Sequence, residues 1–150
     1  MAFDPKVVEA QLALNLVSTT DMPKLAWDAL EAGLDGPAIR RLAALEFPTA
    51  FQVREVLPSV VKEMHLAKIG EVEAALRLAK LRAQEILRSN SDPFKHLRDF
   101  EHLWIQAHYC RELQEYGNLD DEVYVARSMS QPEPEIRAWL MERLKKLADS

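Results

Sequence analysis

The feature that most constrains the fold is a series of helix start signals in which a capping residue precedes a proline. Asp4-Pro5, Asp35-Gly36-Pro37 and Asp92-Pro93 all have this form. An Asp side chain accepts a hydrogen bond from a first-turn N–H, and proline fits the first helical position because no partner awaits an N–H there. Between these signals apolar residues recur every three or four positions, as on one face of a helix. The pattern predicts a series of helices joined by short turns.

These signals and the spacing of the apolar residues predict about seven or eight helices. Their expected ranges are 4–17, about 20–33, about 37–45, about 49–69, about 71–88, about 93–116, 123–129 and about 134–147. Pro58 falls inside the fourth of these, and we expect it to kink that helix because proline removes one backbone hydrogen bond. The predicted helix content is roughly 70%, about twice the usual fraction.

No stretch of useful length alternates apolar and polar residues, so a β-sheet is not expected. The predicted fold class is all-α, an irregular orthogonal helical bundle, because the helices are unequal in length and the connections are short. A short solenoid of helical hairpins is the alternative, although the sequence has no repeat of fixed period. The 150 residues match the usual size of one domain, so we expect a single helical domain over residues 1–150.

Composition excludes several classes of protein. The net charge is −5 and no third of the chain is strongly basic, whereas nucleic-acid binding depends on clustered Lys and Arg. No apolar run approaches the roughly 20 residues that cross a bilayer, and the N-terminus has no signal-peptide pattern. Cys110 is the only cysteine, so no internal disulfide can form. We expect a cytoplasmic protein that binds neither nucleic acid nor membrane.

Two segments resemble parts of small uncharacterised bacterial helical proteins. One is Ala32 to Leu45, with the sequence AGLDGPAIRRLAAL, and the other is Asp92-Pro93-Phe94. In those proteins a Gly-Leu-Asp-Ser-Pro turn leads into a Leu-Arg-x-Leu-Ala helix, and here Gly36 replaces the serine. The resemblance extends over residues from about 10 to 120. It implies a bacterial, cytoplasmic, all-helical domain of unknown function, and it supplies no catalytic residues.

Three of the four histidines lie on the predicted helix after Asp92, but at 100° per residue they point in three directions. Zinc needs ligands that converge, so we expect no metal and no cofactor. His108 is the candidate general base, because Glu101 and Glu112 lie along the same helix edge and a histidine between two carboxylates can exchange a proton. Arg111 points along the apolar stripe, with Glu115 as its expected partner or an anion in a cleft as the alternative. Cys110 is interpreted as a small buried apolar residue.

An acidic cluster follows on the next segment, and it is the candidate surface for binding a partner. Its members are Glu112, Glu115, Asp120, Asp121 and Glu122. Helix capping and solubility are the simpler explanation of these charges.

With no catalytic motif, cofactor loop or basic groove, the sequence favours a non-enzymatic protein–protein interaction module. One alternative is an immunity or antitoxin-like protein whose acidic cluster covers a basic partner. Another is an enzyme with a site around His108, Glu101 and Arg111. A protein partner is expected, and the chain could also form a homodimer.

Overall fold

The computed structural model describes residues 3–150, of which none lies in a β-strand. Of these residues 74% are helical, so the predicted all-α class is confirmed. Its contacts divide it into two compact units with a boundary between Gly70 and Glu71. Each unit is an irregular bundle with its own buried core. That the two units together behave as one domain stays a prediction.

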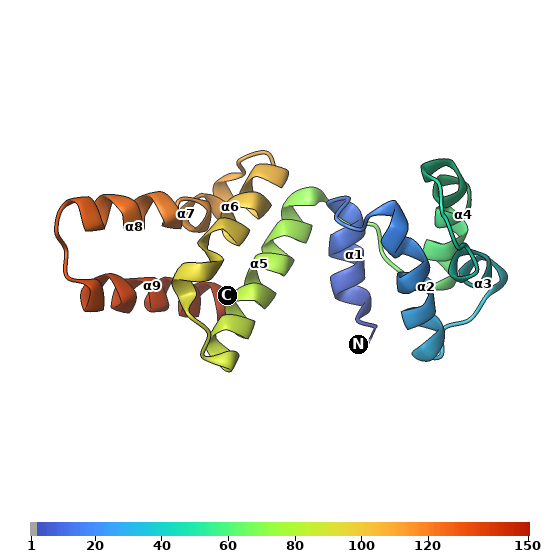
Figure 1. Ribbon diagram of the computed structural model, residues 1–150, viewed down its shortest axis with the longest axis horizontal. Coiled ribbons are helices and arrows are strands. Elements are labelled where there is room, and N and C mark those ends of the chain that lie inside the picture. The colour runs from blue at the N-terminus through green and yellow to red at the C-terminus, as the bar shows by residue number, and fades with distance from the viewer. Residues whose placement is uncertain (1–2) are drawn as a thin grey trace. The chain divides into compact units, whose positions relative to one another are not determined.

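The first unit contains four α-helices and one short 3-10 helix: α1 (Pro5–Ala13), η1 (Thr19–Asp21), α2 (Met22–Glu31), α3 (Pro37–Ala43) and α4 (Ala50–Glu63). Helix α3 packs against both α2 and α4 (Figure 1). The core is built from one apolar side of each helix, with Val8, Leu25, Ala26, Ala29, Ile39, Leu42, Val53, Val56, Val60 and Met64 among its members.

Two details of this unit differ from the expected helices. Helix α1 ends at Ala13 rather than Val17, because Asn15 adopts the left-handed conformation with φ of 56° and a single such residue ends a helix. Helix α4 runs through Pro58 as one helix, as expected, but it ends at Glu63 rather than near residue 69. The kink at Pro58 stays a prediction. The start of α4 is stabilised as the sequence predicts: the Thr49 hydroxyl accepts a hydrogen bond from the Gln52 N–H, and the Gln52 side chain accepts one from the Thr49 N–H.

The start of α3 is held by a side chain from another helix. Gly36 precedes α3 and has no side chain to cap it. Instead, the Glu63 carboxylate at the end of α4 accepts hydrogen bonds from the Ala38 N–H at 3.1 Å and the Ile39 N–H at 2.9 Å. A Cβ atom at position 36 would overlap this carboxylate. The absence of a side chain at Gly36 therefore leaves the space that Glu63 occupies.

Replacing Glu63 by glutamine is expected to lower the free energy of unfolding by about 1 kcal/mol, because an amide removes the charge and can accept only through one atom. Chemical denaturation followed by circular dichroism measures the change. The matched control is Glu55→Gln on the same helix, whose side chain is exposed and whose replacement should change stability by less than about 0.5 kcal/mol. Equal effects of the two substitutions would show that the Glu63 cap contributes nothing.

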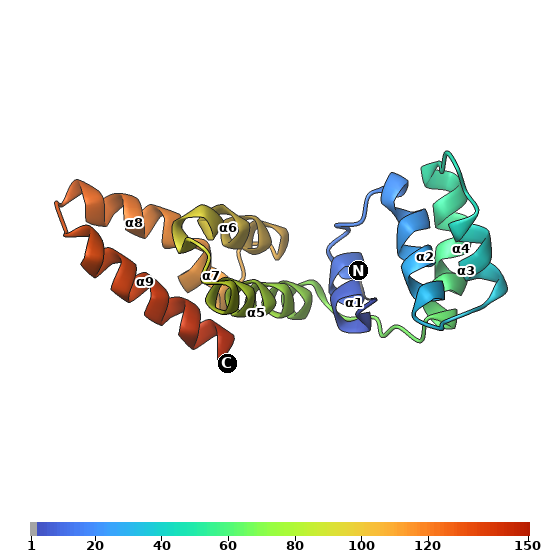
Figure 2. The same ribbon diagram turned by 60° about the horizontal axis from the view of Figure 1, so that its bottom comes forward.

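The second unit contains α5 (Glu71–Ser89), η2 (Pro93–His96), α6 (Leu97–Gln106), α7 (Arg111–Gly117), α8 (Leu119–Ser128) and α9 (Glu133–Ala148). Helix α5 packs against α9 and α6, and α8 and α9 form a helical hairpin (Figures 1 and 2). The core contains Ala75, Ala79, Ala83, Ile86, Phe100, Leu113, Leu119, Ile136, Leu140 and Leu144. Small alanines line the inner side of α5, which allows the neighbouring helices to approach closely.

The single long helix expected over about 93–116 is wrong. The segment is instead the 3-10 helix η2 followed by α6 and α7. His108 and Tyr109 both have positive φ values, 57° and 56°, and two consecutive left-handed residues cannot continue a right-handed helix. The Trp104 indole N–H donates to the Cys110 carbonyl at 2.9 Å, and the Tyr109 ring meets the Trp104 ring edge to face at 5.0 Å. These contacts hold the turn between α6 and α7.

Within the described residues, no helix has both the length and the apolar composition that a membrane span requires.

Candidate functional site

The three residues of the possible enzyme site lie on three separate segments: α6, the turn after it, and α7. His108 lies in the turn after α6, where its side chain is 80% exposed and its Nε2 lies 3.0 Å from Oε2 of Glu71 at the start of α5. Glu101 is half-buried on α6, and Arg111 is exposed at the first position of α7. Within residues 3–150, no hydrogen bond or ion pair joins any two of Glu101, His108 and Arg111. The edge expected to align Glu101, His108 and Glu112 requires a continuous helix, and the break after Gln106 removes it.

Two neighbours of this turn also differ from expectation. Cys110 is half-buried rather than buried, and it is the residue before α7, where its carbonyl accepts the Trp104 hydrogen bond. Arg111 does not point into the apolar core, because α7 begins in a new direction after the turn. Glu115, its expected partner, pairs with α9 instead.

The acidic cluster is partly neutralised within the unit. Glu115 accepts hydrogen bonds from Nζ of Lys146 at 3.1 and 3.3 Å, and its Oε1 lies 4.0 Å from Nε of Arg143. Glu122 accepts from Nη1 of Arg143 at 2.9 Å. Both cations belong to α9, so these pairs join α7 and α8 to the last helix. Glu115 and Glu122 therefore have less charge to offer a partner than the sequence indicates.

The remaining three members of the cluster lie at the surface. Glu112 and Asp121 are exposed and Asp120 is half-buried. In the part of the chain that the structure describes, neither Glu112 nor Asp121 makes an ion pair. Asp121 lies in the first turn of α8, where a negative charge is favourable because of the helix dipole.

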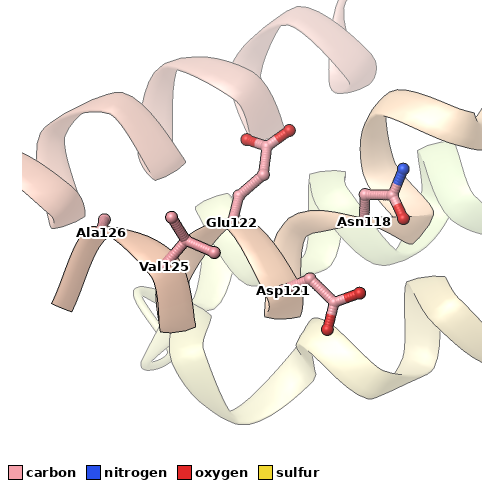
Figure 3. Close-up of a pocket in the computed structure, with 5 residues that line it drawn as sticks. All are labelled: Asn118, Asp121, Glu122, Val125 and Ala126. Atoms are coloured by element: carbon pink, nitrogen blue, oxygen red, sulfur yellow. The ribbon is translucent and has the colours of Figure 1, made fainter. Parts of the chain in front are cut away.

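Two shallow hollows lie along α7 and α8. One has a volume of about 390 Å³ and is lined by Asn118, Asp121, Glu122, Val125 and Ala126 (Figure 3). The other has a volume of about 380 Å³ and is lined by Arg111, Gln114, Glu115, Asn118, Glu122 and Arg143. Because Asn118 and Glu122 line both hollows, they form one continuous surface. We call the residues of the first hollow, together with Tyr124 and Met129, the α8 surface.

The α8 surface exposes three large apolar side chains, two on α8 and one at the residue that caps its C-terminal end. Tyr124 is 74% exposed, Val125 is 53% exposed and Met129, the residue that caps the helix, is 79% exposed. The buried residue Val123 points away from Val125, because residues two apart on a helix differ by 200° in direction. The surface thus combines apolar side chains with the carboxylate of Asp121.

Interactions at the end of the α8 to α9 hairpin hold this surface in place. Arg127 donates to both carboxylate oxygens of Glu133, at 2.7 and 3.3 Å. The hydrogen bond from Arg127 lowers the pKa of Glu133 below its usual value. The Arg127 guanidinium also lies 4.9 Å from the centre of the Phe94 ring, a favourable cation–π distance. The hairpin is therefore tied to η2 at its far end.

A second group of residues, which the sequence did not reveal as a site, lies where α5 leads into α6. Oγ of Ser91 is 2.9 Å from Nε2 of His96, and Nδ1 of His96 is 3.5 Å from Oδ2 of Asp99. The order hydroxyl, imidazole, carboxylate is that of a nucleophile, its base and the group that orients the base. In the sequence, Ser91 reads as a turn residue. Only the 3-10 conformation of residues 93–96 brings the His96 ring back over it.

Within residues 3–150, no group of three or more His, Cys, Asp or Glu side chains is arranged to hold a metal ion. Compared with known proteins, the chain matches no family model, no curated protein and no solved structure.

Proposed function

We propose that this protein is a cytoplasmic, non-enzymatic protein–protein interaction module whose partner binds the α8 surface. The observation that carries this proposal is the exposure of Tyr124, Val125 and Met129 beside a hollow. Single exposed apolar residues are ordinary on a monomer, whereas a group of them next to a concave surface is typical of an interaction site.

The chemistry of the α8 surface indicates what the partner presents. Val125 and Met129 are four residues apart and lie on one side of the helix, and a partner gains free energy by covering them. Asp121 lies four residues before Val125 and has no cation of its own among the described residues. The complementary partner has an apolar ridge flanked by a Lys or Arg that reaches Asp121.

This partner differs from the one that an immunity or antitoxin-like protein would need. That alternative relies on the whole acidic cluster facing a basic surface. Glu115 and Glu122 are already paired with Lys146 and Arg143, so charge alone supports binding less than the apolar side chains do. The enzyme alternative has less support, because no hydrogen bond or ion pair joins any two of Glu101, His108 and Arg111 among the described residues.

The test places a photo-crosslinking amino acid at position 125 in the protein expressed in its native host. The matched control places it at Glu85, which is exposed on α5. We expect position 125 to crosslink one stoichiometric partner that position 85 does not. Adding Met129→Asp should weaken that binding by about 2 kcal/mol, or about 30-fold, as for a central interface residue. Identical crosslinks from both positions, or binding that survives Met129→Asp unchanged, would exclude the α8 surface as the site.

A further inference from the structure

We propose that Ser91 is a nucleophile activated by His96 and that it accepts an acyl group from activated esters such as aryl esters. This inference is independent of the α8 surface and of the proposed function. It rests on the arrangement of Ser91, His96 and Asp99 around the turn between α5 and α6.

The turn conformation brings the two reacting groups together. Asp92 caps η2, since its Oδ1 accepts a hydrogen bond from the Phe94 N–H at 3.2 Å. The short helix then places His96 five residues after Ser91, with its Nε2 2.9 Å from the Ser91 hydroxyl. Both side chains are half-buried, so the pair is shielded in part and remains open to a small reagent.

Asp99 sets the direction of the hydrogen bond. A carboxylate facing Nδ1 favours the imidazole tautomer that carries its proton on Nδ1. Asp99 lies on that side, 3.5 Å from Nδ1 of His96, so Nε2 is left as the acceptor and the Ser91 hydroxyl donates to it. Arg82 shares the same carboxylate, with its Nε 3.6 Å from Oδ2 of Asp99, which helps to hold the Asp99 side chain in position. This is the tautomer that a general base requires.

The proposed step is acyl transfer to serine. Oγ of Ser91 attacks the ester carbonyl as its proton moves to Nε2 of His96, and a bond forms between Oγ and the acyl carbon. The bond from that carbon to the aryl oxygen breaks, and the aryl oxide leaves with the electron pair. His96 then releases the proton to solvent. The products are acyl-Ser91, the free aryl oxide and one proton.

The backbone of the turn limits the reaction to activated esters. Three of its N–H groups are already used: Phe94 N donates to the Asp92 side chain, Lys95 N donates to the Asp92 carbonyl, and Ser91 N donates to the Ile86 carbonyl. The N–H groups of Ser91, Phe94 and Lys95 are therefore not available to stabilise a tetrahedral oxyanion, and that stabilisation is usually the largest contribution to catalysis. The barrier to acyl transfer must instead be lowered by a good leaving group on the ester. For the same reason hydrolysis of acyl-Ser91 is slow and the adduct accumulates.

The full-length protein is incubated with p-nitrophenyl acetate, and acetylated peptides are located and quantified by mass spectrometry over time. The location of the adduct matters, because exposed histidines can also release p-nitrophenolate. Ser89 is the internal control: it lies two residues away, and its hydroxyl donates to the Glu85 carbonyl at 2.7 Å instead of to a base. We expect acetylation of Ser91 to exceed that of Ser89 at least tenfold, since general-base assistance contributes about 10²–10⁴-fold.

Three variants separate activation from simple exposure. His96→Gln should reduce acetylation of Ser91 to the level of Ser89, and Asp99→Asn should reduce it in part while leaving the fold intact by circular dichroism. Ser91→Ala should remove the adduct and leave other acetylated sites unchanged. Equal acetylation of Ser91 and Ser89 in the wild-type protein overturns the proposal, as does an unchanged rate in a folded His96→Gln variant.

Discussion

Replacing Phe100 by alanine is expected to lower the free energy of unfolding by about 3–5 kcal/mol, the usual cost of deleting a buried aromatic side chain. Phe100 lies on α6 and has no exposed surface. Its removal loses the free energy of burying the ring and leaves a cavity among well-packed neighbours, because protein interiors relax only in part. Urea denaturation followed by far-ultraviolet circular dichroism measures the loss.

The matched control is Phe51→Ala, which makes the same chemical change at a position that is 64% exposed on α4. It should alter stability by no more than about 0.5 kcal/mol. A loss in Phe100→Ala as small as that in the control would mean that Phe100 is not packed as described.

The same measurement tests the single-domain prediction. A single domain unfolds in one transition. Phe100→Ala should therefore lower the urea midpoint of one transition in which both units unfold. Two transitions, of which only one moves, would show that the units on either side of Gly70 unfold independently.

Replacing Gly117 by alanine is expected to lower the free energy of unfolding by about 2–3 kcal/mol, because the added methyl group overpacks a buried site. A Cβ atom at this position would lie 2.5 Å from atoms of the Trp104 ring. Gly117 is the last residue of α7, where alanine would otherwise favour the helix by about 0.5–1 kcal/mol. The steric overlap is the larger effect, so the net change is destabilising. Denaturation gives the size of the loss, and tryptophan fluorescence reports the displacement of Trp104.

Gly70→Ala provides the control for this substitution. A Cβ atom at position 70 would meet nothing within 4 Å, so the change should be close to neutral. Equal stability of Gly117→Ala and Gly70→Ala would contradict the close contact between Gly117 and Trp104.

The sequence alone predicted the all-α class and most helix starts, because these depend on local interactions. Asp4 caps α1, Thr49 and Gln52 form the capping box of α4, and Asp92 caps η2. Each of these hydrogen bonds joins residues at most three positions apart, so the local sequence is enough to predict it.

The break between α6 and α7 could not be predicted from the local sequence. The apolar spacing through this segment fits one long helix, and neither His108 nor Tyr109 is a helix-ending residue such as glycine or proline. Their left-handed conformations are retained because Trp104 bonds to Cys110 and packs against Gly117. Tertiary contacts of this kind override local preference.

The candidate sites also depend partly on local sequence and partly on tertiary contacts. The sequence identified the acidic cluster, but it could not show that Arg143 and Lys146, more than twenty residues away, neutralise Glu122 and Glu115. It contained Ser91 and His96, but their contact depends on a single 3-10 turn. Local hydrogen bonds and apolar spacing therefore determined the helices. Packing between helices decided which charges remain free, which apolar side chains stay exposed and which polar groups meet, because those outcomes depend on distances between segments that the sequence does not contain.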